Sequence, residues 1–122
     1  MIEIARRLAA LKRTWQTLEV APRSLALLGL PGKDSRFVEE LIDGLAFMSS
    51  TLETAPQESL TMVRRSCEEQ LKHLEAFFTI QSQEAPAIRM LGFITLLLQM
   101  ESILKGATAQ ILDIHAPNRN IA

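Results

Sequence analysis

The sequence predicts an all-α protein, a four-helix bundle with antiparallel successive helices and a long, central C-terminal helix. Apolar residues recur every three or four positions in four separate segments, which is the spacing of one helix face. The connections between these segments are short and contain Pro or Gly, and runs that alternate apolar with polar residues are scarce. A length of 122 residues and a hydrophobic fraction of 48% suit a single domain, residues 1–122, with its own core.

The first helix is expected over residues 1–20, and Pro22 ends it. Its apolar residues alternate spacings of three and four, as in a helix packed nearly parallel to its neighbours. They are Met1, Ile4, Leu8, Leu11, Trp15 and Leu18. Residues 21–35 are expected to form a short apolar connecting loop that caps one end of the core, with one helical turn before Gly29.

The second helix is expected over residues 36–53, with Asp34 or Ser35 as its N-cap. Thr54 and Gln57 match a capping box and predict the start of the third helix. The apolar faces of both helices point to a shared core. They comprise Phe37, Val38, Leu41, Ile42, Leu45, Met48 and Leu52 on the second helix, and Leu60, Val63, Cys67, Leu71, Leu74 and Phe78 on the third.

The fourth helix is expected over residues 86–114, with Gly92 and Gly106 inside it and a loose tail of residues 116–122 after it. Unlike the other three helices, it is apolar almost all round. One side carries Ile88, Leu91, Ile94 and Leu98, and another carries Phe93, Leu97, Met100 and Leu104. A helix that is apolar on most faces has to be buried on most faces. Either the other helices surround it, or its outer side meets a second copy or a different protein.

Charge is unevenly distributed along the chain. Residues 1–33 carry six basic and two acidic residues, whereas residues 34–84 carry four basic and ten acidic residues. The simpler interpretation is that a basic first helix pairs with acidic second and third helices. The alternative is a nucleic-acid or anionic-lipid site on the first helix that uses Arg6, Arg13 and neighbouring residues. The pI of the sequence is near 6.1, far below that of a typical nucleic-acid-binding domain, and this counts against nucleic-acid binding.

The sequence predicts no catalytic residue, metal site or cofactor. A phosphate loop is excluded because Leu27 stands where the first Gly is needed and Asp34 follows Lys33. Glu69 and His73 form only one carboxylate–histidine set, which cannot close a metal site. The single Cys rules out an internal disulfide and is expected to lie on an inner helix face.

Three polar residues of the fourth helix, Glu101, Thr108 and His115, are seven positions apart and fall within its apolar surface. One interpretation is a polar lining for a small-ligand cavity between helices. A second is that polar residues in an apolar seam fix the register and the partner. The third is that Glu101 and Lys105 reach solvent together.

We therefore expect a non-enzymatic helical protein–protein interaction module: an adaptor, a chaperone or assembly factor, or a regulatory subunit. It would act as a homodimer or within a hetero-complex. Exposed Phe47, or the loop at residues 27–30, would lie at the margin of the interface. The interface residues would be Phe47, Ile88, Leu91, Ile94 and Leu98.

Two other functions remain as alternatives: a ligand-binding or enzymatic bundle with a pocket beside Glu101, Thr108 and His115, and nucleic-acid binding through Arg6 and Arg13. We expect a cytoplasmic protein, because the first residues are not the basic start and apolar run of a secretory signal. No membrane span is expected, since the most apolar stretch, residues 88–104, contains charged residues.

Overall fold

Four α-helices and one short 3₁₀ helix account for the regular structure in the computed structural model, which describes residues 1–17, 25–78 and 86–115. The elements are α1 (Ile2–Gln16), the 3₁₀ helix η1 (Leu25–Leu28), α2 (Ser35–Leu52), α3 (Gln57–Phe77) and α4 (Pro86–His115). The expected all-α class and the four helices are confirmed. The expected core position Leu18 and the tail 116–122 lie outside the described residues, as do the side chains of Leu27 and His115.

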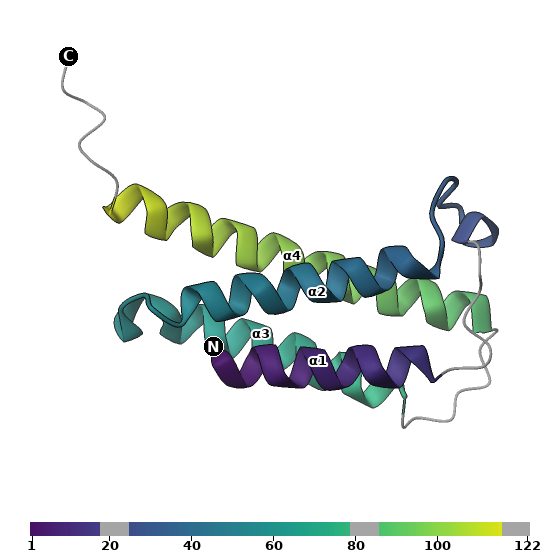
Figure 1. Ribbon diagram of the computed structural model, residues 1–122, viewed down its shortest axis with the longest axis horizontal. Coiled ribbons are helices and arrows are strands. Elements are labelled where there is room, and N and C mark those ends of the chain that lie inside the picture. The colour runs from purple at the N-terminus through teal and green to yellow at the C-terminus, as the bar shows by residue number, and fades with distance from the viewer. Residues whose placement is uncertain (18–24, 79–85, 116–122) are drawn as a thin grey trace, which may run out of the picture.

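Successive helices run in opposite directions, as the short connections predicted (Figure 1). Helix α1 packs against α2 and α3, and helix α4 packs against the same two helices from the other side. The ring order is therefore α1–α2–α4–α3. In this order the chain crosses the bundle between α2 and α3. The neighbouring pairs α1/α3 and α2/α4 consequently run parallel, while α1/α2 and α3/α4 run antiparallel.

An aromatic cluster ties three of the helices together near one end of the bundle. The rings of Trp15 and Phe93 stack with their centroids 5.4 Å apart, which joins α1 to α4. Phe77 and Phe78 at the end of α3 approach the Phe93 ring at 5.1 and 5.2 Å between centroids. Arg89 lies over the Phe77 ring and donates a hydrogen bond to the Phe77 carbonyl at 3.0 Å. This charged residue of the apolar helix is thereby satisfied at the edge of the core.

The ends of α2 show one confirmed and one wrong prediction. The Asp34 carboxylate accepts hydrogen bonds from the N–H groups of Arg36 and Phe37, at 3.0 and 3.3 Å, and so caps α2 as predicted. The capping box at Thr54 does not form. The Thr54 hydroxyl donates instead to the carbonyl of Thr51, because residues 53–55 still continue the turns that end α2. Helix α3 begins later, at Gln57.

Helix α4 is continuous through both of its glycines and forms one side of the bundle. Its buried residues all face the other helices. They are Met90, Phe93, Ile94, Leu97, Met100, Leu104 and Ala107. The opposite side of α4 is exposed, so the other helices do not surround it. Figure 1 shows the last turns of α4 diverging from the rest of the bundle.

Candidate functional site

The exposed side of α4 carries no charged residue over four turns and includes three large aliphatic side chains. Ile88, Leu91 and Leu98 are 60%, 43% and 41% exposed. Between residues 88 and 102 every exposed position of α4 lacks a charge, and we call this set the outer face of α4. It consists of Ile88, Leu91, Gly92, Thr95, Leu98, Gln99 and Ser102. Three of the four α4 residues expected at an interface are thus accessible.

The fourth, Ile94, was wrongly placed on that side. It is only 1% exposed and belongs to the core. Successive helix residues are about 100° apart around the axis, so Ile94 lies between the inward Phe93 direction and the outward Leu91 direction. Because α4 packs against α2, α3 and η1, its covered arc is wide enough to include Ile94.

Two glycines leave the outer side of α4 open to close approach. A Cβ atom built on Gly92 or Gly106 would meet no atom within 4 Å, so packing within the chain does not require glycine at either position. Glycine inside a helix costs about 0.5–1 kcal/mol relative to alanine. Their presence is a cost to this bundle that its own described packing does not explain.

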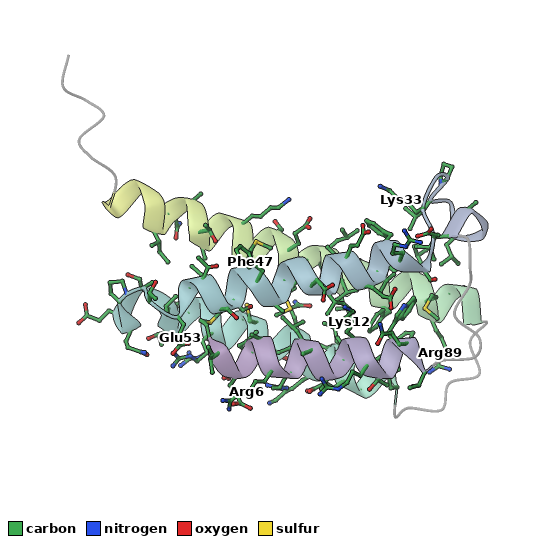
Figure 2. The ribbon with its side chains drawn as sticks, viewed as in Figure 1. Arg6, Lys12, Lys33, Phe47, Glu53 and Arg89 are labelled. Carbon is green, nitrogen blue, oxygen red and sulfur yellow. The ribbon has the colours of Figure 1, made fainter. Side chains whose placement is uncertain are left out.

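Phe47 belongs to a different surface from the outer face of α4. Its side chain is 73% exposed and projects from α2 (Figure 2). It borders a shallow groove of about 450 Å³ between α1 and α2, which we call the alanine groove. The lining residues are Ile2, Ala5, Arg6, Ala9, Ala46, Phe47 and Ser50.

The alanine groove was missed by sequence reasoning, although the sequence contains a signal for it. Ala5 and Ala9 are four residues apart on α1, and Ala46 and Ser50 are four apart on α2. Small residues at this spacing lie on one helix face and leave it shallow. What the sequence alone could not supply is that these two faces lie side by side.

The three polar residues of α4 do not form one site. Glu101 is half-buried and its Oε1 lies 3.5 Å from Lys105 Nζ, which agrees with the interpretation that the two reach solvent together. Seven residues separate Glu101 from Thr108, or about 10 Å along a helix. His115 lies in the last turn of α4, and its side chain is outside the described part of the chain.

Thr108 does line a hollow, about 440 Å³ in volume, where α4 diverges from the turn between α2 and α3. The lining is Thr51, Leu52, Thr54, Ala55, Pro56, Thr108 and Ile111. All three threonine hydroxyls already donate to carbonyl oxygens of Phe47, Thr51 and Leu104. A wall without charge and with its hydroxyl protons engaged offers little for orienting a polar ligand.

Two of the four basic residues of α1 pair with the acidic helices, which confirms the simpler interpretation in part. Arg7 makes two hydrogen bonds to Glu75 of α3, one of them 3.2 Å between Nε and Oε2. Lys12 Nζ lies 2.9 Å from an oxygen of Asp43 on α2. Of the two residues proposed for nucleic acid, Arg6 pairs with exposed Glu3 at 3.3 Å, and Arg13 is exposed.

Two further contacts fix α1 against the end of α2. Glu53 accepts hydrogen bonds from the amino group of Met1 at 2.5 Å and from the Ile2 N–H at 2.7 Å. These hydrogen bonds, in that order of size, lower the pKa of the Glu53 carboxyl. At the other end of α1, the Gln16 amide donates to Glu39 at 2.6 Å. Together with Lys12 and Asp43, these pairs set the register between the two antiparallel helices.

Helix α3 carries the two residues of the sequence analysis whose chemistry depends most on their surroundings, Cys67 and His73. Cys67 is fully buried, and that burial raises the pKa of its thiol to about 11, so it is protonated at neutral pH. His73 is exposed beside Glu69, with 3.5 Å between Nε2 and Oε1. Over the described ranges, no three His, Cys, Asp or Glu side chains are grouped so as to hold a metal ion.

Comparisons with protein-family models, with curated proteins and with solved structures gave no match. By length and composition alone, the Ile88–Ile111 stretch of α4 could cross a membrane, which is weak evidence because the core helix of a soluble bundle passes the same test. The two exposed surfaces are therefore the features from which a function can be argued.

Proposed function

We propose that this chain is a non-enzymatic protein–protein interaction module that binds a helix of a partner protein along the outer face of α4. The observation that carries the proposal is the seven exposed positions of that face, none of which is charged. Surface helices of monomeric proteins normally carry charged and polar residues on the exposed side, whereas here three of the seven positions are large aliphatic residues and the other four are Gly, Thr, Gln and Ser. An exposed apolar strip on a regular helix is typical of a surface that another protein covers.

The spacing of the strip favours a helical partner. Ile88 and Leu91 are three residues apart and Leu98 follows seven residues later, which places all three along one side of the helix. Partner helices are recognised through anchors spaced three, four and seven residues apart, and the spacings here are three and seven. Full burial of a large aliphatic side chain yields about 1.5–3 kcal/mol, and these three side chains are about half accessible.

The open glycines favour close helix packing at the same place. Gly92 lies between Leu91 and Thr95 on the exposed side, with no atom near its missing Cβ. A second helix could therefore approach the α4 backbone closely at this turn, as helices do where small residues line the contact. This would give the glycine a role that offsets its cost to the isolated bundle.

The test compares Leu98→Asp with Met62→Asp, which places the same charge on α3 at another exposed apolar side chain. Both variants should fold, as judged by circular dichroism, because both side chains are exposed. Partners would be identified by affinity purification and their binding remeasured with purified proteins. We expect Leu98→Asp to weaken binding at least tenfold and Met62→Asp to leave it unchanged.

A core control separates lost binding from lost folding. Ile94→Asp should unfold the chain, because a buried unpaired charge costs several kcal/mol. Equal binding by wild type and Leu98→Asp would overturn the proposal. Binding to neutral lipid vesicles that Leu98→Asp abolishes, with no protein partner, would assign the outer face of α4 to a membrane surface instead.

A further inference from the structure

We propose that the alanine groove between α1 and α2 docks a second copy of this chain, with Phe47 of each copy entering the groove of the other. This inference goes beyond the proposed function, since it concerns other helices and a different partner. Two features of α1 and α2 that lie next to each other support it. A large aromatic side chain, 73% exposed, stands on the same face as a groove floored by Ala5, Ala9 and Ala46. A face that carries both a projection and a recess can complement itself.

The register of α1 and α2 fixes how two copies would meet. A twofold axis parallel to the helices lays α1 of one copy on α2 of the other and keeps residues of equal height opposite each other. Phe47 lines the same groove as Ala5 and Ala9 and therefore lies at their height. Under this symmetry each Phe47 faces the two alanines of the opposite copy, and both recesses are filled.

The charges on the same face favour this arrangement over the other possible twofold. Because Lys12 pairs with Asp43 and Gln16 with Glu39, Arg13 and Glu40 both lie in the short interval between these two cross-helix pairs. Arg13 and Glu40 are both exposed. Laying α1 on α2 brings Arg13 of each copy toward Glu40 of the other. A twofold axis that lies in the interface perpendicular to the helices would instead lay α1 on α1 and α2 on α2, so that Arg13 would no longer meet Glu40 of the other copy.

Arg6 supplies a further contact at the centre of the interface. It is exposed and lines the alanine groove from α1, as Phe47 does from α2. Its guanidinium would lie next to the entering Phe47 ring of the other copy, a pairing that aromatic rings and arginines favour. Arg6, whose internal partner is the exposed Glu3, thus joins Arg13, Glu40 and Phe47 in one proposed interface.

The first measurement is the mass in solution of the full chain by light scattering over a wide concentration range. We expect a dimer, and we expect Phe47→Ala to weaken it at least tenfold while circular dichroism stays unchanged. Leu98→Asp should remain dimeric, because the outer face of α4 is not used. A wild-type chain that stays monomeric up to its solubility limit would overturn the inference. So would a dimer that Leu98→Asp disrupts and Phe47→Ala does not.

A charge exchange tests the geometry itself. Arg13→Glu and Glu40→Arg should each dissociate the dimer, because each places like charges together at both symmetric contacts. An equimolar mixture of the two variants should associate, since one contact is then native and the other is reversed. A mixture that stays monomeric, or single variants that still dimerise, would exclude this arrangement. Neither outcome bears on partner binding at the outer face of α4, so failures of the two proposals are distinguishable.

Discussion

Burial makes the thiol of Cys67 weakly acidic and unreactive. Cys67 lies on α3 with no accessible surface, and removal from water disfavours its thiolate, which raises the pKa of the thiol to about 11 from its ordinary 9.0. A reactive thiol needs a lowered pKa and access to solvent, and Cys67 has neither. Its side chain therefore acts as a small apolar group of the core.

The raised pKa of the Cys67 thiol should make the folded protein less stable at alkaline pH. The thiol loses its proton near pH 9 in the unfolded chain and near pH 11 in the folded chain, so the unfolded state is favoured as the pH rises between these values. We expect the free energy of unfolding of the wild type, relative to Cys67→Ala, to be constant below pH 9. It should then fall by on the order of 3 kcal/mol by pH 11. Urea titrations across this range measure the difference, and parallel curves for the two proteins would contradict the expectation.

Helix α4 has a packed inner side, which stabilises the bundle, and an outer side with glycines, which cost the bundle stability. Its inner side packs against α2 and α3, while its outer side carries Gly92 and Gly106 over open space. A chain selected only for stability would carry alanine at both positions. Gly32, in the loop before α2, differs because its φ of 80° is a conformation that other residues adopt only with strain.

Alanine substitutions should therefore act in opposite directions. We expect Gly92→Ala and Gly106→Ala each to stabilise the isolated chain by about 0.5–1 kcal/mol, and Gly32→Ala to destabilise it by about 1 kcal/mol. Chemical denaturation followed by circular dichroism gives the three values. If a partner helix packs closely on α4, Gly92→Ala should also weaken its binding. Destabilisation by Gly92→Ala would show that the glycine is needed within the fold.

Local patterns predicted the helices better than they predicted the helix neighbours. The apolar spacing located all four helices within a few residues, because the three-to-four repeat is a property of one segment. The ring order depends on which way the chain crosses after α2, and nothing in the short turn encodes that. Ile94 was misplaced for the same reason, because the width of the covered arc depends on how many helices pack against α4.

The two candidate surfaces also differ in how far the sequence predicted them. The exposure of Phe47, Ile88, Leu91 and Leu98 was predictable, since it follows from the position of each residue around its own helix. The groove beside Phe47 was not, because its other wall comes from α1, about forty residues earlier in the chain. A surface formed by two helices requires the tertiary arrangement throughout, whereas for a surface on one helix the period gives its centre and only its edge, as at Ile94, depends on the neighbouring helices.

Across the whole molecule, the aromatic cluster links elements that are distant in sequence. Phe93 of α4 contacts Trp15 of α1 and both phenylalanines at the end of α3. Ion pairs from α1 to α2 and α3 connect the same bundle at its surface, where each contributes about 1 kcal/mol or less. The buried aromatic contacts are therefore the main connection between α1 and α4, which lie across the bundle from each other.

This architecture predicts cooperative unfolding. Trp15 is the single tryptophan of the chain, so its fluorescence reports on the aromatic cluster, while circular dichroism reports on all helices. The two denaturation curves should coincide, as for small two-state domains. Phe93→Ala should shift both curves together and cost about 3–5 kcal/mol. Met62→Ala, at an exposed site outside both proposed interfaces, should change stability by no more than about 0.5 kcal/mol. Separate transitions for the two signals would instead show that α1 or α4 unfolds while the other helices remain folded, and that the cluster does not hold the bundle together as one unit.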